Sequence, residues 1–307
     1  MCYNVVKLEG GGEIMGDGTM GLSLVFSSAL AHQAEVMTVK RYGDKHGQGG
    51  MFFNAILCLF AVVFFLFSDK GGLVFPSGVV AFGLANSGLY AIGFYTGYLS
   101  YIYGSFGLTR LVTSFVCIIP IFYGIVFERE TQGVIFYVAV ALILASLFLM
   151  RFQKNSGEGK TQFSLKWIIS VIFVIISNGF ITVLGKMQHS AFGDTYKNEY
   201  LIVTFIGSAF WLFLMGFILE RKSFKSTIKF GVVYGAVAGL FNALNNWLTL
   251  TTYNYMAISI SAPLKTGISL VLSFLVSLIV YKERFSARQI LAVVLGTVAV
   301  VMINLPQ

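Results

Sequence analysis

The sequence predicts an all-α polytopic membrane protein with ten transmembrane helices in two inverted five-helix repeats. Three observations lead to this fold class: the composition, the number of long apolar segments and a repeated motif. Apolar residues make up 57% of the chain and charged residues 11%, and the mean hydropathy is +0.81. Soluble domains are on average far more polar. The chain is therefore expected to cross a lipid bilayer several times.

Ten apolar segments account for most of the chain. A helix needs roughly 17 to 25 residues to cross a hydrocarbon core of about 30 Å, and each segment approaches or exceeds that length. The predicted spans are residues 20–39, 51–67, 76–98, 107–127, 132–150, 164–185, 199–219, 229–250, 258–280 and 287–305. The stretches between them are too short to form a soluble domain.

A charged motif divides these spans into two sets of five. Residues 128–131 read Glu-Arg-Glu-Thr, and residues 283–286, shifted by 155 positions (283 − 128), read Glu-Arg-Phe-Ser. The same shift pairs Arg110 with Lys265. A fixed internal period indicates a duplicated fold. A repeat with an odd number of spans enters the membrane upside down on its second occurrence, an arrangement typical of transporters.

The duplication defines the expected organisation of the chain. The parts are an N-terminal tail at 1–19, a first repeat at 20–150, a linker at 151–163 and a second repeat at 164–307. The tail combines glycines with charged residues and lacks the apolar core of a signal peptide, so Met15 and Met20 are alternative starts.

Helix starts can be read from the repeated motif. Thr131 is expected to cap the fifth helix, and Ser286 with Gln289 forms a capping box for the tenth. Glu128 and Glu283 would then lie just ahead of helix N-termini, where the macrodipole favours a carboxylate. They either stabilise tight interhelical turns or contact a substrate.

Polar side chains concentrate in the first, third, fourth, sixth, eighth and ninth spans. Such groups are costly in hydrocarbon, so they are expected to face the bundle interior or a wet cavity. The fifth and tenth spans carry almost nothing polar before Asn304, which predicts a lipid-facing outer pair. The candidate substrate-binding residues are His32, Glu35, Asn86, Tyr90, Arg110, Ser114, Asn178, Thr182, Asn242, Asn245, Asn246, Trp247, Lys265 and Ser269.

Each candidate also has a purely structural explanation. An asparagine in a membrane helix can join helices rather than bind a ligand. His32 and Glu35 lie one turn apart and form either a proton-binding pair or an ordinary polar contact. Arg110 and Lys265 either recognise an anionic substrate or extend to the lipid headgroups.

The second copy of the motif resembles a known family. Residues 281–290 (Tyr-Lys-Glu-Arg-Phe-Ser-Ala-Arg-Gln-Ile) lead into an apolar helix with Gly296, which resembles the end of an EamA-type repeat of the drug/metabolite transporter (DMT) superfamily. The first copy keeps Glu128 but has Ala141 in place of the glycine, and neither copy has the family's preceding proline. The resemblance implies ten helices in two inverted repeats, a cavity lined by the six spans named above, and transport of a small metabolite or drug.

Other classes of protein fit the sequence less well. The three cysteines, Cys2, Cys58 and Cys117, suggest neither a disulfide framework nor a metal site. There is no HExxH or Gly-x-Ser-x-Gly motif, so neither an enzyme nor a cofactor is expected. A non-transporting membrane receptor or scaffold stays an alternative.

The net charge of +8 is explained by loops at the membrane surface, without a nucleic-acid partner. Lys and Arg number 14 in the loops after odd-numbered spans and 5 on the other side, which favours termini outside the cell. The family resemblance favours termini inside. The expected partners are the lipid bilayer of the cell (inner) membrane and a small-molecule substrate, for a monomer or homodimer.

Overall fold

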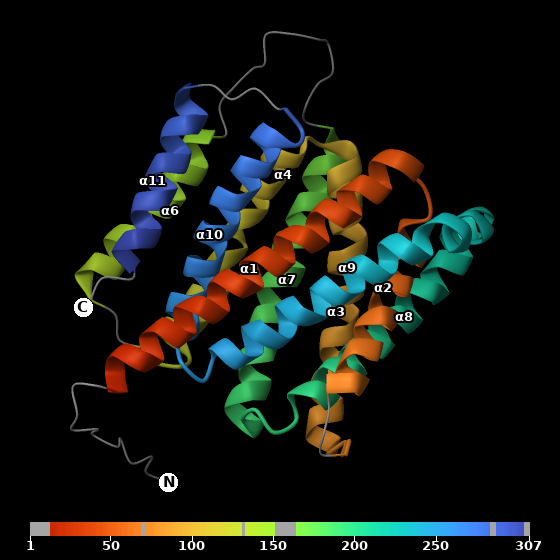
Figure 1. The fold of residues 1–307 in the computed structure, drawn as a ribbon, viewed down its shortest axis with the longest axis horizontal. Coiled ribbons are helices and arrows are strands. Elements are labelled where there is room, and N and C mark those ends of the chain that lie inside the picture. The colour runs from red at the N-terminus through yellow and green to blue at the C-terminus, as the bar shows by residue number, and fades with distance from the viewer. Residues whose placement is uncertain (1–12, 69–71, 131–132, 151–163, 283–286, 304–307) are drawn as a thin grey trace.

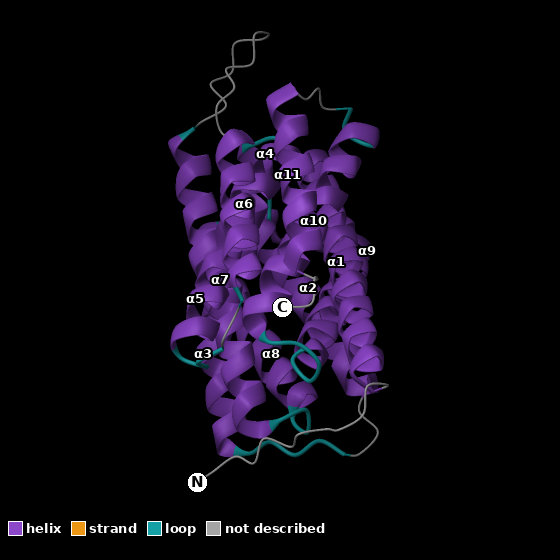
Figure 2. Ribbon diagram, turned by 90° about the vertical axis from the view of Figure 1, so that its left-hand side faces the viewer, coloured by secondary structure: helices purple, strands orange, loops and turns teal. Residues whose placement is uncertain are grey.

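The computed structural model describes residues 13–68, 72–130, 133–150, 164–282 and 287–303, and this part of the chain is helical with short connections and no strands (Figures 1 and 2). The helices are α1 (Glu13–His46), α2 (Gly50–Ser68), α3 (Ser77–Tyr103), α4 (Phe106–Thr113), η1 (Ser114–Cys117), α5 (Ile118–Val126), α6 (Val134–Met150), α7 (Leu165–Phe192), α8 (Lys197–Leu219), η2 (Arg221–Ser223), α9 (Phe224–Thr252), α10 (Ile258–Ile279) and α11 (Ala287–Ile303). The predicted all-α fold is confirmed.

Within the described residues, six helical segments are long and apolar enough to cross a membrane: α2, α3, α7, α8, η2 with α9, and α10. Their mean hydropathy ranges from 1.3 to 2.5. The other predicted spans coincide with α1, with the broken run α4–η1–α5, and with α6 and α11, which have 17 residues each. The chain thus has the helices expected of a multi-pass membrane protein.

The two sequence halves interlock instead of forming separate bodies. α1 and α2 pack against α9, α3 packs against α7 and α8, α2 packs against α8, and α6 packs against α11. If α1 is exchanged with α7, α2 with α8, α3 with α9 and α6 with α11, the same set of packing pairs results. In Figure 1, α1 runs upward from the lower left of the bundle, whereas α7 runs downward from its top. The two helices therefore run in opposite directions.

The predicted fourth span is interrupted. It is α-helical at both ends, but residues Ser114–Cys117 form a 3₁₀ turn. Pro120 explains the position, because it has no N–H to bond the carbonyl of Val116 and its ring presses on that carbonyl. The hydroxyls of Thr113 and Ser114 also donate to the carbonyl of Arg110, at 3.0 and 2.8 Å. These local bonds compete with a regular helix.

The structure corrects the expected role of Glu128. Its carboxylate accepts from the hydroxyls of Tyr123 at 2.9 Å and Ser190 at 3.4 Å, and α6 begins only at Val134. The carboxylate at a helix start is instead that of Glu130. Thr131, the Glu283–Ser286 motif and the linker lie outside the described residues, as does Asn304.

Glu130 caps α10, a helix of the other half. Its two carboxylate oxygens accept from the backbone N–H groups of Ile258 at 3.1 Å and Ser259 at 3.0 Å. Arg129 before it has a positive φ of 55°, and Lys282 has a φ of 52°. These two left-handed residues are 153 positions apart (282 − 129), and each is followed by a glutamate. The turns therefore correspond at a shift of 153, not 155.

The outer pair predicted from the apolar fifth and tenth spans is present. α6 and α11 lie side by side at one edge of the bundle (Figure 1) and share a small core that includes Phe136, Ala139, Ala292 and Ala299. The main core lies between the remaining helices and draws on both halves. The helices that carry polar residues thus surround the main core, and α10 packs against α11 of the outer pair.

Gly239 on α9 lets this helix approach α2 closely. A Cβ placed there would lie 2.4 Å from the backbone oxygen of Leu57. Because that oxygen belongs to a helix backbone, only separation of the helices would relieve the clash. The Gly-x-x-x-Gly pair at 235 and 239 is therefore a packing motif.

We predict that Gly239→Ala destabilises the fold by about 1–3 kcal/mol, the usual cost of overpacking. The measurement is the thermal unfolding midpoint of the detergent-purified protein. Gly88→Ala is the matched control, since a Cβ at Gly88 meets nothing within 4 Å. An equal effect of both substitutions would contradict this account of the α2–α9 contact.

Candidate binding site

A cavity of about 250 Å³ lies inside the bundle. Its walls come mainly from α1, α3, α4, η1, α5, α7, α9 and α10. Asn54 of α2 and Tyr200 and Leu201 of α8 also line it. Both sequence halves therefore line it. These are the helices in which the sequence concentrates polar side chains, so the cavity lies where the polar pattern predicts an interior face.

Thirteen of the fourteen predicted site residues line this cavity. They are His32, Glu35, Asn86, Tyr90, Arg110, Ser114, Asn178, Thr182, Asn242, Asn245, Asn246, Lys265 and Ser269. That they bind a substrate stays a prediction, but the structure brings them together around one space.

Trp247 is the residue that does not line it. The ammonium of Lys197 lies 4.2 Å from the centroid of the Trp247 ring, a cation–π contact next to the start of α8. Lys197 also donates to Asp194 at 2.7 Å and to Thr251 at 2.9 Å. Trp247 therefore belongs to this cluster, because three consecutive helical residues cannot all face the same way.

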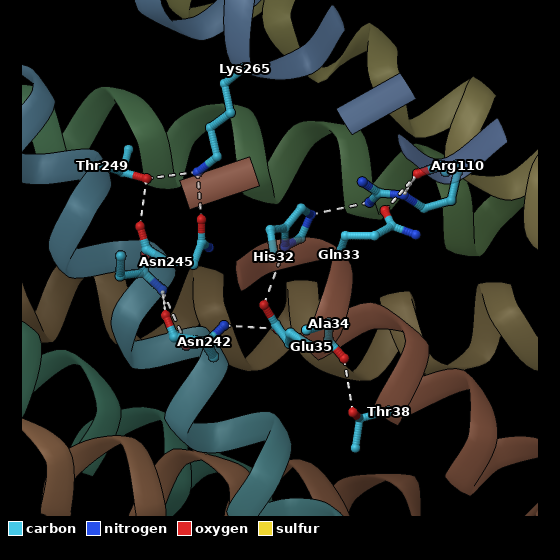
Figure 3. A network of polar contacts seen from close by, with 12 residues as sticks. His32, Gln33, Ala34, Glu35, Thr38, Arg110, Asn242, Asn245, Thr249 and Lys265 are labelled. Carbon is cyan, nitrogen blue, oxygen red and sulfur yellow. Dashed lines mark hydrogen bonds and ion pairs between the residues drawn. The ribbon is translucent and has the colours of Figure 1, made fainter. Parts of the chain in front are cut away.

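A chain of polar contacts crosses the cavity (Figure 3). Arg110 Nη1 lies 3.1 Å from His32 Nε2, and His32 Nδ1 lies 3.2 Å from Glu35 Oε2. Asn242 Nδ2 donates to Glu35 Oε1 at 2.8 Å. Glu35 is buried, with 7% of its side chain exposed. The chain joins α4 and α1 of the first half to α9 of the second.

The chain continues along α9 toward α3. Asn246 Nδ2 donates to the carbonyl oxygen of Asn242 at 2.9 Å and to its Oδ1 at 3.1 Å. Tyr90 donates its hydroxyl to Asn246 Oδ1. Asn242 and Asn246 thus join helices and also line the cavity, and contact with a ligand stays a prediction.

Lys265 forms the second cationic group of the cavity. Its ammonium donates to Asn245 Oδ1 and Thr249 Oγ1, both at 2.7 Å, and both partners are neutral (Figure 3). Arg110 Nε donates to Ser273 Oγ at 3.0 Å. These internal bonds hold both cations inside the bundle.

The charge of the cavity is unbalanced. Glu35, Arg110 and Lys265 are the charged side chains among the described lining residues, apart from the titratable His32. No carboxylate of the described residues lies within ion-pair distance of Arg110 or Lys265. Two cations face one carboxylate, so the cavity carries net positive charge and attracts anions.

Sequence reasoning missed several partners in the site. Thr249 lies one helical turn after Asn245, and Ser273 one turn after Ser269, so helical spacing could have found both. Tyr200 on α8 accepts a hydrogen bond from Asn86, and no pattern in the sequence indicated that it lines the cavity. Asn86 Oδ1 is buried with no partner among the described residues.

Comparisons with known proteins give a fold and no family. No protein-family model and no curated protein matches the sequence. A solved structure described only as "Crystal structure of protein" superposes with a TM-score of 0.63 at 13% sequence identity, covering 94% of this chain and 96% of the other. At that identity the likeness concerns fold alone. Its coverage indicates that nearly the whole chain forms one architecture that another protein shares.

Proposed function

We propose that the chain is a small-molecule transporter of the cell (inner) membrane that works by alternating access. The observation that carries this proposal is the polar cavity lined by both sequence halves, with two cations whose partners are neutral. An internal cavity between interlocked halves is what a transporter needs to hold its substrate away from both aqueous phases.

The architecture we propose is ten transmembrane helices in two inverted repeats, as in EamA-type members of the DMT superfamily. In this scheme α1, α6, α11 and the broken run from α4 to α5 cross the membrane together with the six longer apolar segments. The packing pairs that exchange between halves support it, because an inverted duplication makes each pair recur. Rocking of one set of helices against the other would open the cavity alternately to each side.

The substrate class we propose is a small organic anion, a carboxylate or a phosphate ester. Glu35 is already bonded through both oxygens, to His32 and Asn242. Among the residues that the structure describes, Arg110 and Lys265 have only neutral partners. A charge left unpaired in a low-dielectric cavity is costly. An anion would pair with both. Asn86, with its unpartnered amide oxygen, offers an acceptor for a substrate hydroxyl.

A membrane receptor or scaffold would bind a ligand without moving it, so flux distinguishes the classes. The first step is a thermal-shift screen of carboxylates and phosphate esters against the detergent-purified protein, because a ligand that binds the folded state stabilises it. Hits are then tested for uptake in proteoliposomes. Binding without flux would assign the chain to the receptor class.

We predict that Lys265→Gln and Arg110→Gln each lower uptake of an anionic hit by about 10- to 100-fold, the equivalent of one charge-assisted hydrogen bond of about 1.5–3 kcal/mol. A neutral compound of similar size should be affected far less. Lys166→Gln is the matched control, since Lys166 lies over the Tyr103 ring and away from the cavity. Equal losses for anionic and neutral compounds would contradict charge recognition.

The inverted topology predicts that the turns at Arg129 and Lys282 face opposite sides of the membrane. Single cysteines at these positions, in a chain with Cys2→Ser, should differ in labelling by an impermeant maleimide added to intact cells. The native Cys58 and Cys117 are buried and serve as the background control. Labelling of both turns from the same side would rule out an odd number of spans per repeat.

A further inference from the structure

The partners of His32 fix where its proton lies. A guanidinium has five N–H donors and no acceptor, so the contact between Arg110 Nη1 and His32 Nε2 at 3.1 Å requires Nε2 to accept. The ring is then neutral and carries its proton on Nδ1. That N–H donates to Glu35 Oε2 at 3.2 Å. An imidazolium, or the other tautomer, would place two donors face to face.

The orientation of two asparagine amides shows how Glu35 is bonded. Asn246 Nδ2 bonds the backbone carbonyl of Asn242, which can only accept, so the Asn246 amide cannot be flipped. The same nitrogen faces Asn242 Oδ1, which leaves Asn242 Nδ2 to donate to Glu35 Oε1. Both oxygens of Glu35 therefore accept hydrogen bonds, as those of a carboxylate do.

Of the groups that face His32, Arg110 determines whether Nε2 can bind a proton. On α1 itself the neighbour is the Glu35 carboxylate; α10 contributes Lys265, and α4 contributes Arg110. The polar groups of α9 in this network are neutral amides, and α3 contributes the hydroxyl of Tyr101 beside Arg110. Among the described residues, Arg110 alone contacts Nε2. Without it, the nitrogen would be free, on a ring already bonded to a carboxylate.

We propose that His32 Nε2 is a proton-binding site that the contact with Arg110 closes and that a bound anion opens. An anion draws the guanidinium away from Nε2, and a proton from water then bonds to that nitrogen. The resulting imidazolium pairs with Glu35. Arg110 can move in this way because its other partners, Ser273 at 3.0 Å and the hydroxyl of Tyr101, are neutral.

Binding of the anion and the proton is then cooperative, and by linkage each raises the affinity for the other to the same degree. A monovalent anion and one proton add no net charge to the cavity. The proposal rests on the proposed function for its role in transport, where it makes the two ions move together. The proton site itself requires only binding.

The test is nitrogen NMR of the detergent-purified protein with ¹⁵N-labelled histidine, His32 being assigned by comparison with His32→Gln. In the ligand-free protein we expect the neutral ring with its proton on Nδ1. In Arg110→Gln the protonated fraction of His32 at a given pH near neutrality should increase several-fold. Lys265→Gln is the matched control: it also removes a cation but leaves Nε2 covered, and should have a smaller effect.

A double substitution separates the proton site from a change in folding. Adding Glu35→Gln to Arg110→Gln should remove most of the gained protonation, because the imidazolium loses its counter-charge. Acetate, succinate and inorganic phosphate are the anion probes, compared with chloride at equal ionic strength, and at least one should increase protonation of His32 in the wild type but not in Arg110→Gln.

A proton on Nε2 in the ligand-free protein, or unchanged His32 protonation in Arg110→Gln, would overturn the proton site. Unchanged spectra with all three anions would overturn its coupling to anions. These spectra require no flux, so they remain decisive even if the protein binds its ligand without transporting it. Conversely, uptake that proceeds without protonation of His32 would leave the transporter proposal intact.

Discussion

The constraint on which the structure depends is the cost of a polar group in hydrocarbon. A donor, acceptor or charge that enters the bundle is stabilised by a partner inside it, because hydrocarbon offers none. The chain from Arg110 through His32 and Glu35 to Asn242 meets this requirement by joining three helices from both halves (Figure 3). The position of each helix is therefore tied to the polar contents of the cavity.

Helix ends obey the same constraint, and the carboxylates that satisfy them come from other segments of the fold. Glu130 receives the first N–H groups of α10, and Glu220 receives the N–H of Met51 near the start of α2 at 3.0 Å. Partial burial raises the pKa of the Glu220 carboxyl, while the bond from Met51 opposes that rise. Movement of either helix would break these bonds, so the caps couple distant parts of the chain.

Hydropathy and polar patterning were enough to predict the helical membrane class, the helical segments and the residues that surround the cavity. They work because burial in lipid leaves a strong compositional signal. The local events were not predictable in the same way. The 3₁₀ turn before Pro120 depends on backbone geometry, the cap of α10 by Glu130 depends on tertiary contact, and Trp247 turned out to pack on Lys197. The repeated motif matches at a shift of 155, whereas the left-handed residues Arg129 and Lys282 are 153 positions apart. The second correspondence depends on backbone conformation and was not visible in the sequence.

The central claim is that the cavity holds an anion between Arg110 and Lys265. The most direct measurement is the anomalous signal of bromine in crystals of the protein grown with para-bromobenzoate. The account predicts a bromine peak inside the cavity, the carboxylate in contact with both Arg110 and Lys265, and the guanidinium withdrawn from His32. A cavity without bromine, or a carboxylate bound elsewhere while Arg110 still contacts His32, would contradict it.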